Sequence, residues 1–157
     1  MRRVWAGCLL TLLVMTSSLM GQEQSTAMLT LKQPDSPGIL VRSVHSNKDF
    51  LQSAGLKNVS SVSLTGYRIG WVVVYPGGRN KVGLGLRVDV PEGIDPGQTA
   101  EVPAQGVSPH FYADGASAVV FFVTDVHTAT NIVWKPELEK IEQEARQMSR
   151  LIRTPSN

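Results

Sequence analysis

The pattern of hydrophobic and polar positions is strongest in the stretch Leu64–Tyr75, which is rich in β-branched and aromatic residues. It ends at Pro76-Gly77-Gly78, a strong turn signal. Alternate positions from Tyr67 to Tyr75 share one face of a strand, and Val72 and Val74 make the end of the other face hydrophobic as well. We therefore expect a central strand with Trp71 in the core.

A second stretch, Gly115–His127, is also hydrophobic on both faces. Thr128-Ala129-Thr130-Asn131 has the composition of a turn, and Ile132-Val133-Trp134 follows as a short returning strand. The pattern predicts a hairpin here. The core residues that we expect are Ile69, Trp71, Phe122 and Trp134.

The remaining strands are predicted on weaker patterns. Val82–Val90 alternates cleanly and predicts one half-buried strand, in which Gly83 and Gly85 indicate a bulge or a close neighbour. Shorter strands are expected at Ile39–His45, Phe50–Lys57 and Gln98–Pro103, with a short edge strand at Leu29–Leu31.

The hydrophobic period changes after Pro136, a residue favoured at the first position of a helix. Hydrophobic residues then recur at spacings of three and four, which predicts an amphipathic helix over residues 136–153. Two sheet strands with two hydrophobic faces need a cover on the outer side, because a sandwich buries only one face of each sheet. This helix either covers that outer face or projects freely toward a partner.

Six or seven short strands separated by turn clusters, with no helical pattern between them, predict an all-β fold. We expect an antiparallel β-sandwich over residues 38–135, followed by the C-terminal amphipathic α-helix.

The first 21 residues have the pattern of a signal peptide. Arg2 and Arg3 precede a hydrophobic run, and small polar residues follow it. Cleavage after Gly21 or after Ala27 fits, and residues 22–37 are expected to form a linker. The alternatives are an uncleaved anchor, lipidation at Cys8, and export by the twin-arginine route. The main expectation is a periplasmic or extracellular protein without a membrane span after cleavage.

Charge balance and cysteine content limit the kinds of function that we expect. The chain of 157 residues has 15 basic and 13 acidic residues, and without Arg2 and Arg3 the two numbers are equal. This balance gives no support for nucleic-acid binding. Cys8 is the only cysteine and lies in the predicted signal peptide, so we expect no disulfide framework, thiolate metal site or cysteine nucleophile after cleavage.

Motifs for catalysis and cofactor binding are missing from the sequence. There is no Gly-x-Ser-x-Gly, and His45, His110 and His127 are isolated from one another. His127 and Asp125 share a strand face, and an exposed strand end explains the pair. Asn58-Val59-Ser60 fits a glycosylation acceptor but also an ordinary turn. We expect no enzyme activity, no cofactor and no metal.

Three blocks of sequence carry a resemblance to a known group. They are Asn58–Ser60 leading into Gly66–Trp71, then Asp95–Pro103, and then Val119–Val126 with Ile132–Lys135. In this order the chain resembles small secreted bacterial proteins with an immunoglobulin-like β-sandwich, a generally uncharacterised group. Such sequences often carry Asp-Gly before the final Val-Trp, where this chain has Ala129-Thr130-Asn131. The resemblance implies an immunoglobulin-like fold and export, and no activity.

The resulting prediction is an exported, non-enzymatic binding or structural module, whose partner is another exported protein if it has one. The expected interaction surface lies in the loops Pro76–Lys81 and Gly106–Ala113, through Arg79, Lys81, Phe111 and Tyr112. The alternative is an assembly or adaptor protein that binds a partner through its C-terminal helix. A small exported enzyme, or a carbohydrate-binding sandwich with Trp71 or Trp134 facing solvent, is less consistent with the pattern.

Overall fold

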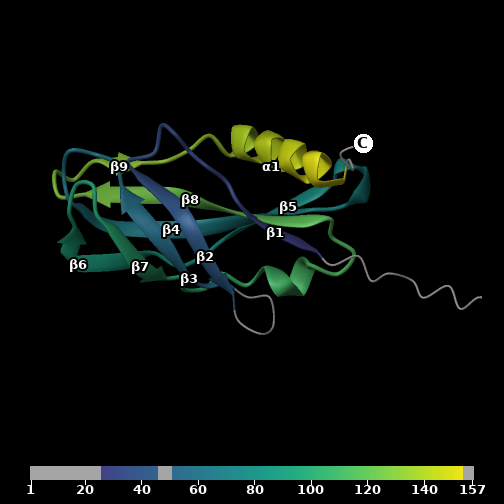
Figure 1. Ribbon diagram of the computed structural model, residues 1–157, viewed down its shortest axis with the longest axis horizontal. Helices are drawn as coiled ribbons and strands as arrows, with labels where there is room; N and C mark the ends of the chain where they lie inside the picture. The colour runs from purple at the N-terminus through teal and green to yellow at the C-terminus, as the bar shows by residue number, and fades with distance from the viewer. Residues whose placement is uncertain (1–25, 46–50, 154–157) are drawn as a thin grey trace, which may run out of the picture.

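The computed structural model describes residues 26–45 and 51–153, and the predicted signal peptide lies outside the described residues. Within these ranges the chain forms two β-sheets and one C-terminal α-helix (Figure 1). The elements in chain order are β1 (Ala27–Thr30), β2 (Gly38–His45), β3 (Leu51–Asn58), β4 (Leu64–Val74), the short 3₁₀ helix η1 (Pro76–Gly78), β5 (Asn80–Leu84), β6 (Val88–Ile94), β7 (Thr99–Pro103), the 3₁₀ helix η2 (Pro109–Tyr112), β8 (Ala118–Thr128), β9 (Val133–Trp134) and α1 (Leu138–Arg153).

The centre of the larger sheet is the antiparallel pair β4–β8, formed by the two stretches with the strongest sequence pattern. Its register runs from Leu64 opposite Thr128 to Val74 opposite Ala118. In the described ranges, β5 and β6 pair with the free side of β4, while β1 and β9 pair with the free side of β8.

The smaller sheet is antiparallel, in the order β2-β3-β7, and packs face to face against the larger one. Side chains from both sheets form the main hydrophobic core, including Leu56 of β3 and Ile69, Trp71 and Phe121 of the larger sheet. The hydroxyl of Tyr67 on β4 donates a 2.6 Å hydrogen bond to the carbonyl oxygen of Pro103 on β7 and so links the sheets. Burial raises the pKa of this hydroxyl.

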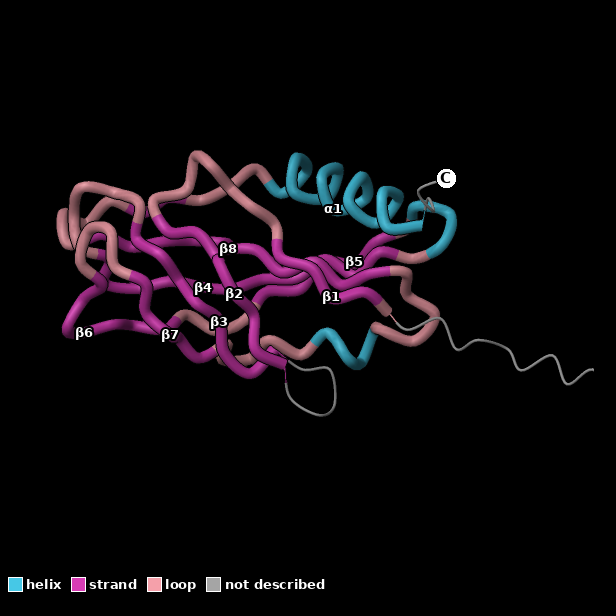
Figure 2. Tube along the Cα trace, in the orientation of Figure 1, coloured by secondary structure: helices cyan, strands magenta, loops and turns pink. Residues whose placement is uncertain are grey.

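Helix α1 lies across the outer face of the larger sheet, as the two-faced strand pattern predicts (Figure 2). Ile141 and Ala145 pack there against a second hydrophobic cluster. That cluster contains Leu31, Val72, Val74, Val120 and Phe122, with Leu29 and Met148 at its margin. Successive residues of β4 and β8 therefore alternate between the main core and the layer under the helix. The projecting helix considered above is not found.

The single strand predicted at Val82–Val90 is wrong, because it is divided into β5 and β6 by residues 85–87. The backbone of Gly85 passes so close to the chain that a Cβ atom there would lie 2.7 Å from the carbonyl oxygens of Ile69 and Gln105. The amide of Leu86 then turns to donate to the Gln105 oxygen at 2.8 Å. Of the hydrophobic positions expected on one buried face, Val82, Leu84 and Leu86 are exposed by 37%, 47% and 63%, whereas Val88 and Val90 pack partly buried against the main core.

The segment predicted as a linker contributes to the fold from residue 26 onward. Strand β1 pairs with β8 in parallel, so the sheets are not purely antiparallel as expected. Gln33 is buried, and its side chain acts as a further partner for the same strand. Its Nε2 donates to the Val123 carbonyl oxygen at 2.9 Å, and its Oε1 accepts from the Val123 amide at 2.7 Å.

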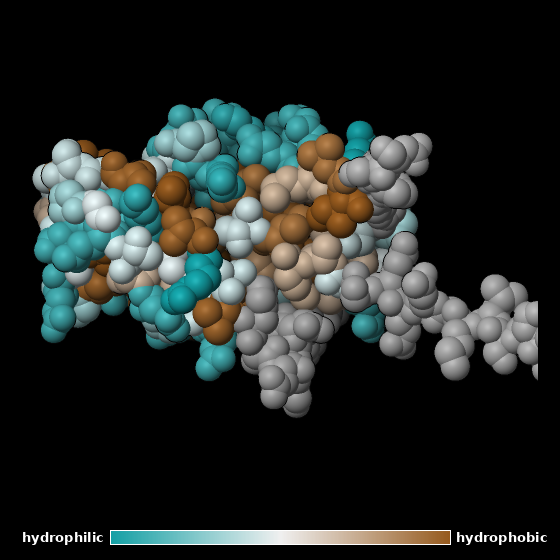
Figure 3. All heavy atoms as spheres, viewed as in Figure 1, coloured by the Kyte–Doolittle hydropathy of each residue, from teal (hydrophilic) through white to brown (hydrophobic). Residues whose placement is uncertain are grey.

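The final hairpin is present, and its turn uses Asn131 with a φ of 60°. Asparagine tolerates this left-handed conformation better than most residues. Trp134 packs partly buried against the main core, while Ile69, Trp71 and Phe122 are buried as predicted. On the face shown in Figure 3, hydrophobic side chains gather below α1 at the end where β1 lies. Among the described residues, no helix has the length and hydrophobicity that a membrane span requires.

Candidate binding surface

One end of the molecule brings together two loops that are distant in sequence, the β4–β5 turn and the loop containing η2. The hydroxyl of Tyr75 donates a 2.6 Å hydrogen bond to the carbonyl oxygen of Tyr112. The Nζ of Lys81 lies 4.6 Å from the centroid of the Tyr112 ring, which is a cation–π distance. These two contacts join the loops into one surface.

The β4–β5 turn determines where its basic side chains lie. Gly77 and Gly78 both have positive φ angles, which an L-residue with a side chain rarely adopts. The turn is closed by a 2.9 Å hydrogen bond from the Tyr75 amide to the Arg79 carbonyl oxygen. Arg79 and Lys81 therefore follow a tight, fixed turn and line a hollow of about 330 Å³ with Tyr75 and Asn80.

The structure brings together three of the four residues predicted for an interaction surface. Arg79 and Lys81 lie on the β4–β5 arm, and Tyr112 is 43% exposed beside Lys81. The side chain of Phe111 lies outside the described part of the structure. Tyr75 was expected only as a strand residue, yet it anchors the site. Its position at the end of the strand, directly before Pro-Gly-Gly, was the available signal.

The last turns of α1 extend this surface and were not predicted to belong to it. Arg146, Ser149 and Arg150 line a second hollow of about 320 Å³ together with the Gly77-Gly78 turn. Glu142 partly balances this charge, since its Oε2 accepts from the Asn80 side chain and lies 3.9 Å from the Arg146 guanidinium. The end of the molecule thus combines basic groups from the helix and from the arm.

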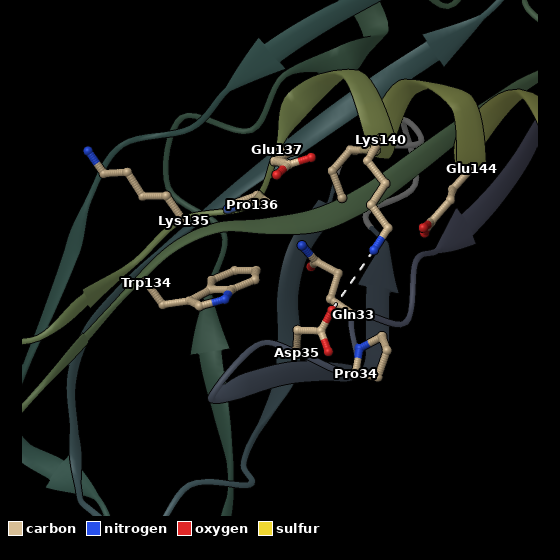
Figure 4. A pocket seen from close by; sticks show the side chains of 10 residues that line it. Gln33, Pro34, Asp35, Trp134, Lys135, Pro136, Glu137, Lys140 and Glu144 are labelled. Carbon is tan, nitrogen blue, oxygen red and sulfur yellow. Dashed lines mark ion pairs between the residues drawn. The ribbon is translucent and has the colours of Figure 1, made fainter.

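A separate pocket of about 230 Å³ lies where α1 begins (Figure 4). The Trp134 ring forms one side, and Asp35 and Lys140 form an ion pair with a separation of 3.9 Å on another. Figure 4 shows the Gln33 side chain between them, but both ends of its amide are already bonded to Val123. The sequence did not predict this pocket, because Gln33 and Asp35 fell in the presumed linker. Its remaining charged groups are too dispersed to indicate a reaction.

Asp125 and His127 do lie together, as their strand spacing indicates, but they are largely buried rather than at an exposed strand end. His127 Nε2 lies 3.2 Å from Asp125 Oδ1, and Arg68 Nε lies 3.3 Å from Asp125 Oδ2. The Arg68 contact falls within ion-pair distance but lacks the alignment of a hydrogen bond. The Thr124 hydroxyl donates to the Arg68 carbonyl oxygen at 3.3 Å and lies 3.5 Å from Asp125 Oδ2, so it is a hydrogen-bond donor to this cluster. The cluster neutralises a buried carboxylate and presents no activated nucleophile.

Within residues 26–45 and 51–153, no group of three histidine, cysteine, aspartate or glutamate side chains is arranged to hold a metal ion. Comparison with family models, curated proteins and solved structures finds no match for this chain. Of the arrangements described here, the surface with basic and aromatic side chains is the one whose composition suits binding.

Proposed function

We propose that this chain is an exported, non-enzymatic binding module with an immunoglobulin-like β-sandwich fold. Its binding surface is the end formed by Tyr75, Arg79, Lys81 and Tyr112. The signal-peptide pattern of residues 1–21 supports a periplasmic or extracellular location. Two sheets packed face to face, together with the three sequence blocks described above, support the immunoglobulin-like assignment.

The observation that carries the proposal is the contact of Lys81 with Tyr112, supported by the hydrogen bond from Tyr75 to the Tyr112 backbone. Tyrosine and arginine are common at the centres of protein interfaces, because they combine a large contact area with polar groups. Here Arg79, Lys81 and an exposed Tyr112 are held by fixed loops, so the binding of a partner costs little conformational entropy. The excess of basic groups favours a partner with negative charge.

The alternative of an adaptor that uses a free C-terminal helix has less support. Ile141 and Ala145 are buried against the sheet, so presenting the hydrophobic face of α1 to a partner would expose that layer to water. The large exposed hydrophobic side chains of the helix lie at its two ends, Leu138 in the first turn and Leu151 and Ile152 in the last.

The proposal is tested with poly-L-glutamate as an anionic polypeptide probe and poly-L-lysine as the opposite probe. We expect saturable binding of poly-L-glutamate by the purified chain from Gln22, measured by calorimetry at low and at physiological salt. The double variant Arg79→Glu/Lys81→Glu should weaken this binding by about tenfold or more, because it reverses two charges in one hollow. The matched control is Arg42→Glu, an exposed basic residue of β2 that pairs with Glu101 on the smaller sheet.

Equal binding by the double variant and by Arg42→Glu would refute the assigned surface. No binding of poly-L-glutamate at any salt concentration would refute the charge preference on which the proposal depends.

A further inference from the structure

Strand β5 forms an open edge of the larger sheet. In the described ranges it is the last strand in the order β1-β8-β4-β5 and has a neighbour on one side only. The flanking hydrogen bonds, Tyr75 amide to Arg79 oxygen at 2.9 Å and Gly85 amide to Ile69 oxygen at 2.8 Å, fix which residues face β4. In an antiparallel ladder these pairs alternate, so the backbone groups of Lys81 and Gly83 also point to β4.

The backbone N–H and C=O groups of Asn80, Val82 and Leu84 therefore point away from the sheet. No hydrogen bond within the described part of the chain ends on these backbone groups. The open stretch stops at Leu86, whose amide is already bonded to Gln105. It is thus five residues long, with the donors and acceptors that a short added strand needs.

The side chains of this edge also suit an added strand. Val82 and Leu84 lie on the face that carries α1, and both side chains are partly exposed. Asn80 lies on the same face, where its side chain donates to Glu142. Lys81 lies on the opposite face, over the Tyr112 ring. An incoming strand would meet hydrophobic side chains on one face and cationic groups on the other.

The other strand edges carry features that block pairing. On β6 these are Asp89, Pro91 and Glu92, and β7 ends with Glu101 and Pro103. Strand β2 has two register shifts, which twist its edge away from regular pairing. Strand β1 is shorter, and the residues before Thr26 lie outside the described part of the structure. Among the edges of β2, β5, β6 and β7, only β5 has no proline, no acidic residue and no register shift.

Charge decides between the two simplest occupants. Residues 76–88 contain Arg79, Lys81 and Arg87 but no acidic residue. Among the described side chains, Arg87 alone of the three has an acidic partner, Asp89, at 2.8 Å. A symmetric pair of β5 strands centred on Val82 would place Arg79 and Lys81 of both copies in one short interface. Like charges gathered in this way disfavour a second copy.

We propose that the β5 edge receives an extended, acidic segment of another exported protein, which adds a strand to the larger sheet. This inference rests on the proposed binding function, since the acidic side chains of the added strand would contact Arg79 and Lys81. Its other face would carry β-branched residues against Val82 and Leu84, so the favoured sequence alternates acidic and β-branched residues.

The probe is a synthetic peptide of alternating valine and glutamate, compared with a peptide in which proline replaces the valines. The key variant is Val82→Pro, which removes an outward amide without removing a hydrogen bond to β4. Its matched control is Val82→Thr, which keeps the amide and the β-branched shape. We expect Val82→Pro to weaken peptide binding by about tenfold and Val82→Thr to weaken it much less, because threonine keeps the outward amide. Because Val82→Pro could unfold the arm, hydrogen exchange of the Val82 and Leu84 amides in the unaltered chain is measured with and without the peptide.

Slower exchange at these two amides, together with the effect of Val82→Pro, supports the proposal. Suppose instead that peptide binding depends on Arg79 and Lys81 but not on Val82→Pro, and that both amides exchange as before. Then the edge is refuted while the binding surface stands. If neither poly-L-glutamate nor the peptide binds, both proposals fail. A dimer that forms without peptide and is lost in Val82→Pro identifies a second copy as the occupant and overturns the inference.

Discussion

Replacing Ile141 tests whether the packing of α1 contributes to stability as its burial implies. Ile141 is 4% exposed and lies in the layer with Val72, Val74, Val120 and Phe122. The variant Ile141→Ala removes three carbon atoms, which costs about 2.4 kcal/mol of transfer free energy at about 0.8 kcal/mol each. A cavity between helix and sheet raises the expected loss to about 3 kcal/mol. For a chain of this length, this corresponds to a fall in Tm of roughly 10 °C.

The control is Leu151→Ala on the same helix, where the side chain is 76% exposed. It removes a similar hydrophobic volume, and we expect a change in the free energy of unfolding within about 0.5 kcal/mol. Both variants are compared by chemical denaturation and by thermal melting monitored by circular dichroism. If Ile141→Ala destabilises the chain no more than Leu151→Ala, the contact between the helix and the sheet contributes little to the free energy of unfolding, and the reasoning is refuted.

Three further predictions concern a glycine contact, a buried tyrosine and the N-terminus. A Cβ at Gly83 would lie 2.1 Å from Trp71 Cζ2, so Gly83→Ala should displace the ring, cost about 1–3 kcal/mol and shift tryptophan fluorescence. Burial raises the pKa of Tyr67, so the folded state keeps the phenol proton at a pH where the unfolded state loses it. The free energy of unfolding should therefore fall as the pH rises above about 10. In denaturation curves measured across that range, Tyr67→Phe should show a smaller fall with pH. Mass spectrometry of the exported protein should find an N-terminus at Gln22 or Met28, and an intact Met1 would refute cleavage.

The sequence predicted the elements whose pattern is local. Leu64–Tyr75 and Gly115–His127 became β4 and β8, because residues on both faces of each strand are hydrophobic and both faces are covered. The position of the helix was predictable for the same reason, because its hydrophobic stripe and the outer face of the sheet each require burial and can bury each other. These predictions required only side-chain period and the cost of exposed hydrophobic surface.

The division of Val82–Val90 could not be predicted, because its cause lies elsewhere in the chain. The alternation continues through Gly85 and Leu86, but Gln105 approaches from a loop about 20 residues later and takes the Leu86 amide. The candidate surface was predictable in part for a similar reason. Arg79, Lys81 and Tyr112 stood out as loop residues, whereas the contact between the loops and the contribution of Arg146 depend on tertiary packing.

The outer side of β8 differs from the open edge of β5. The side of β8 away from β4 is paired by three separate pieces: β1 along Ala118–Phe121, the Gln33 side chain at Val123, and β9 at Val126 and His127. Two of these pieces come from opposite ends of the described chain, and the third is a side chain that takes the place of a backbone. The other side of the central pair ends at β5, whose outward backbone groups at Asn80, Val82 and Leu84 lie beside Arg79 and Lys81 of the candidate binding surface. That coincidence is the strongest reason to look for the partner at this edge.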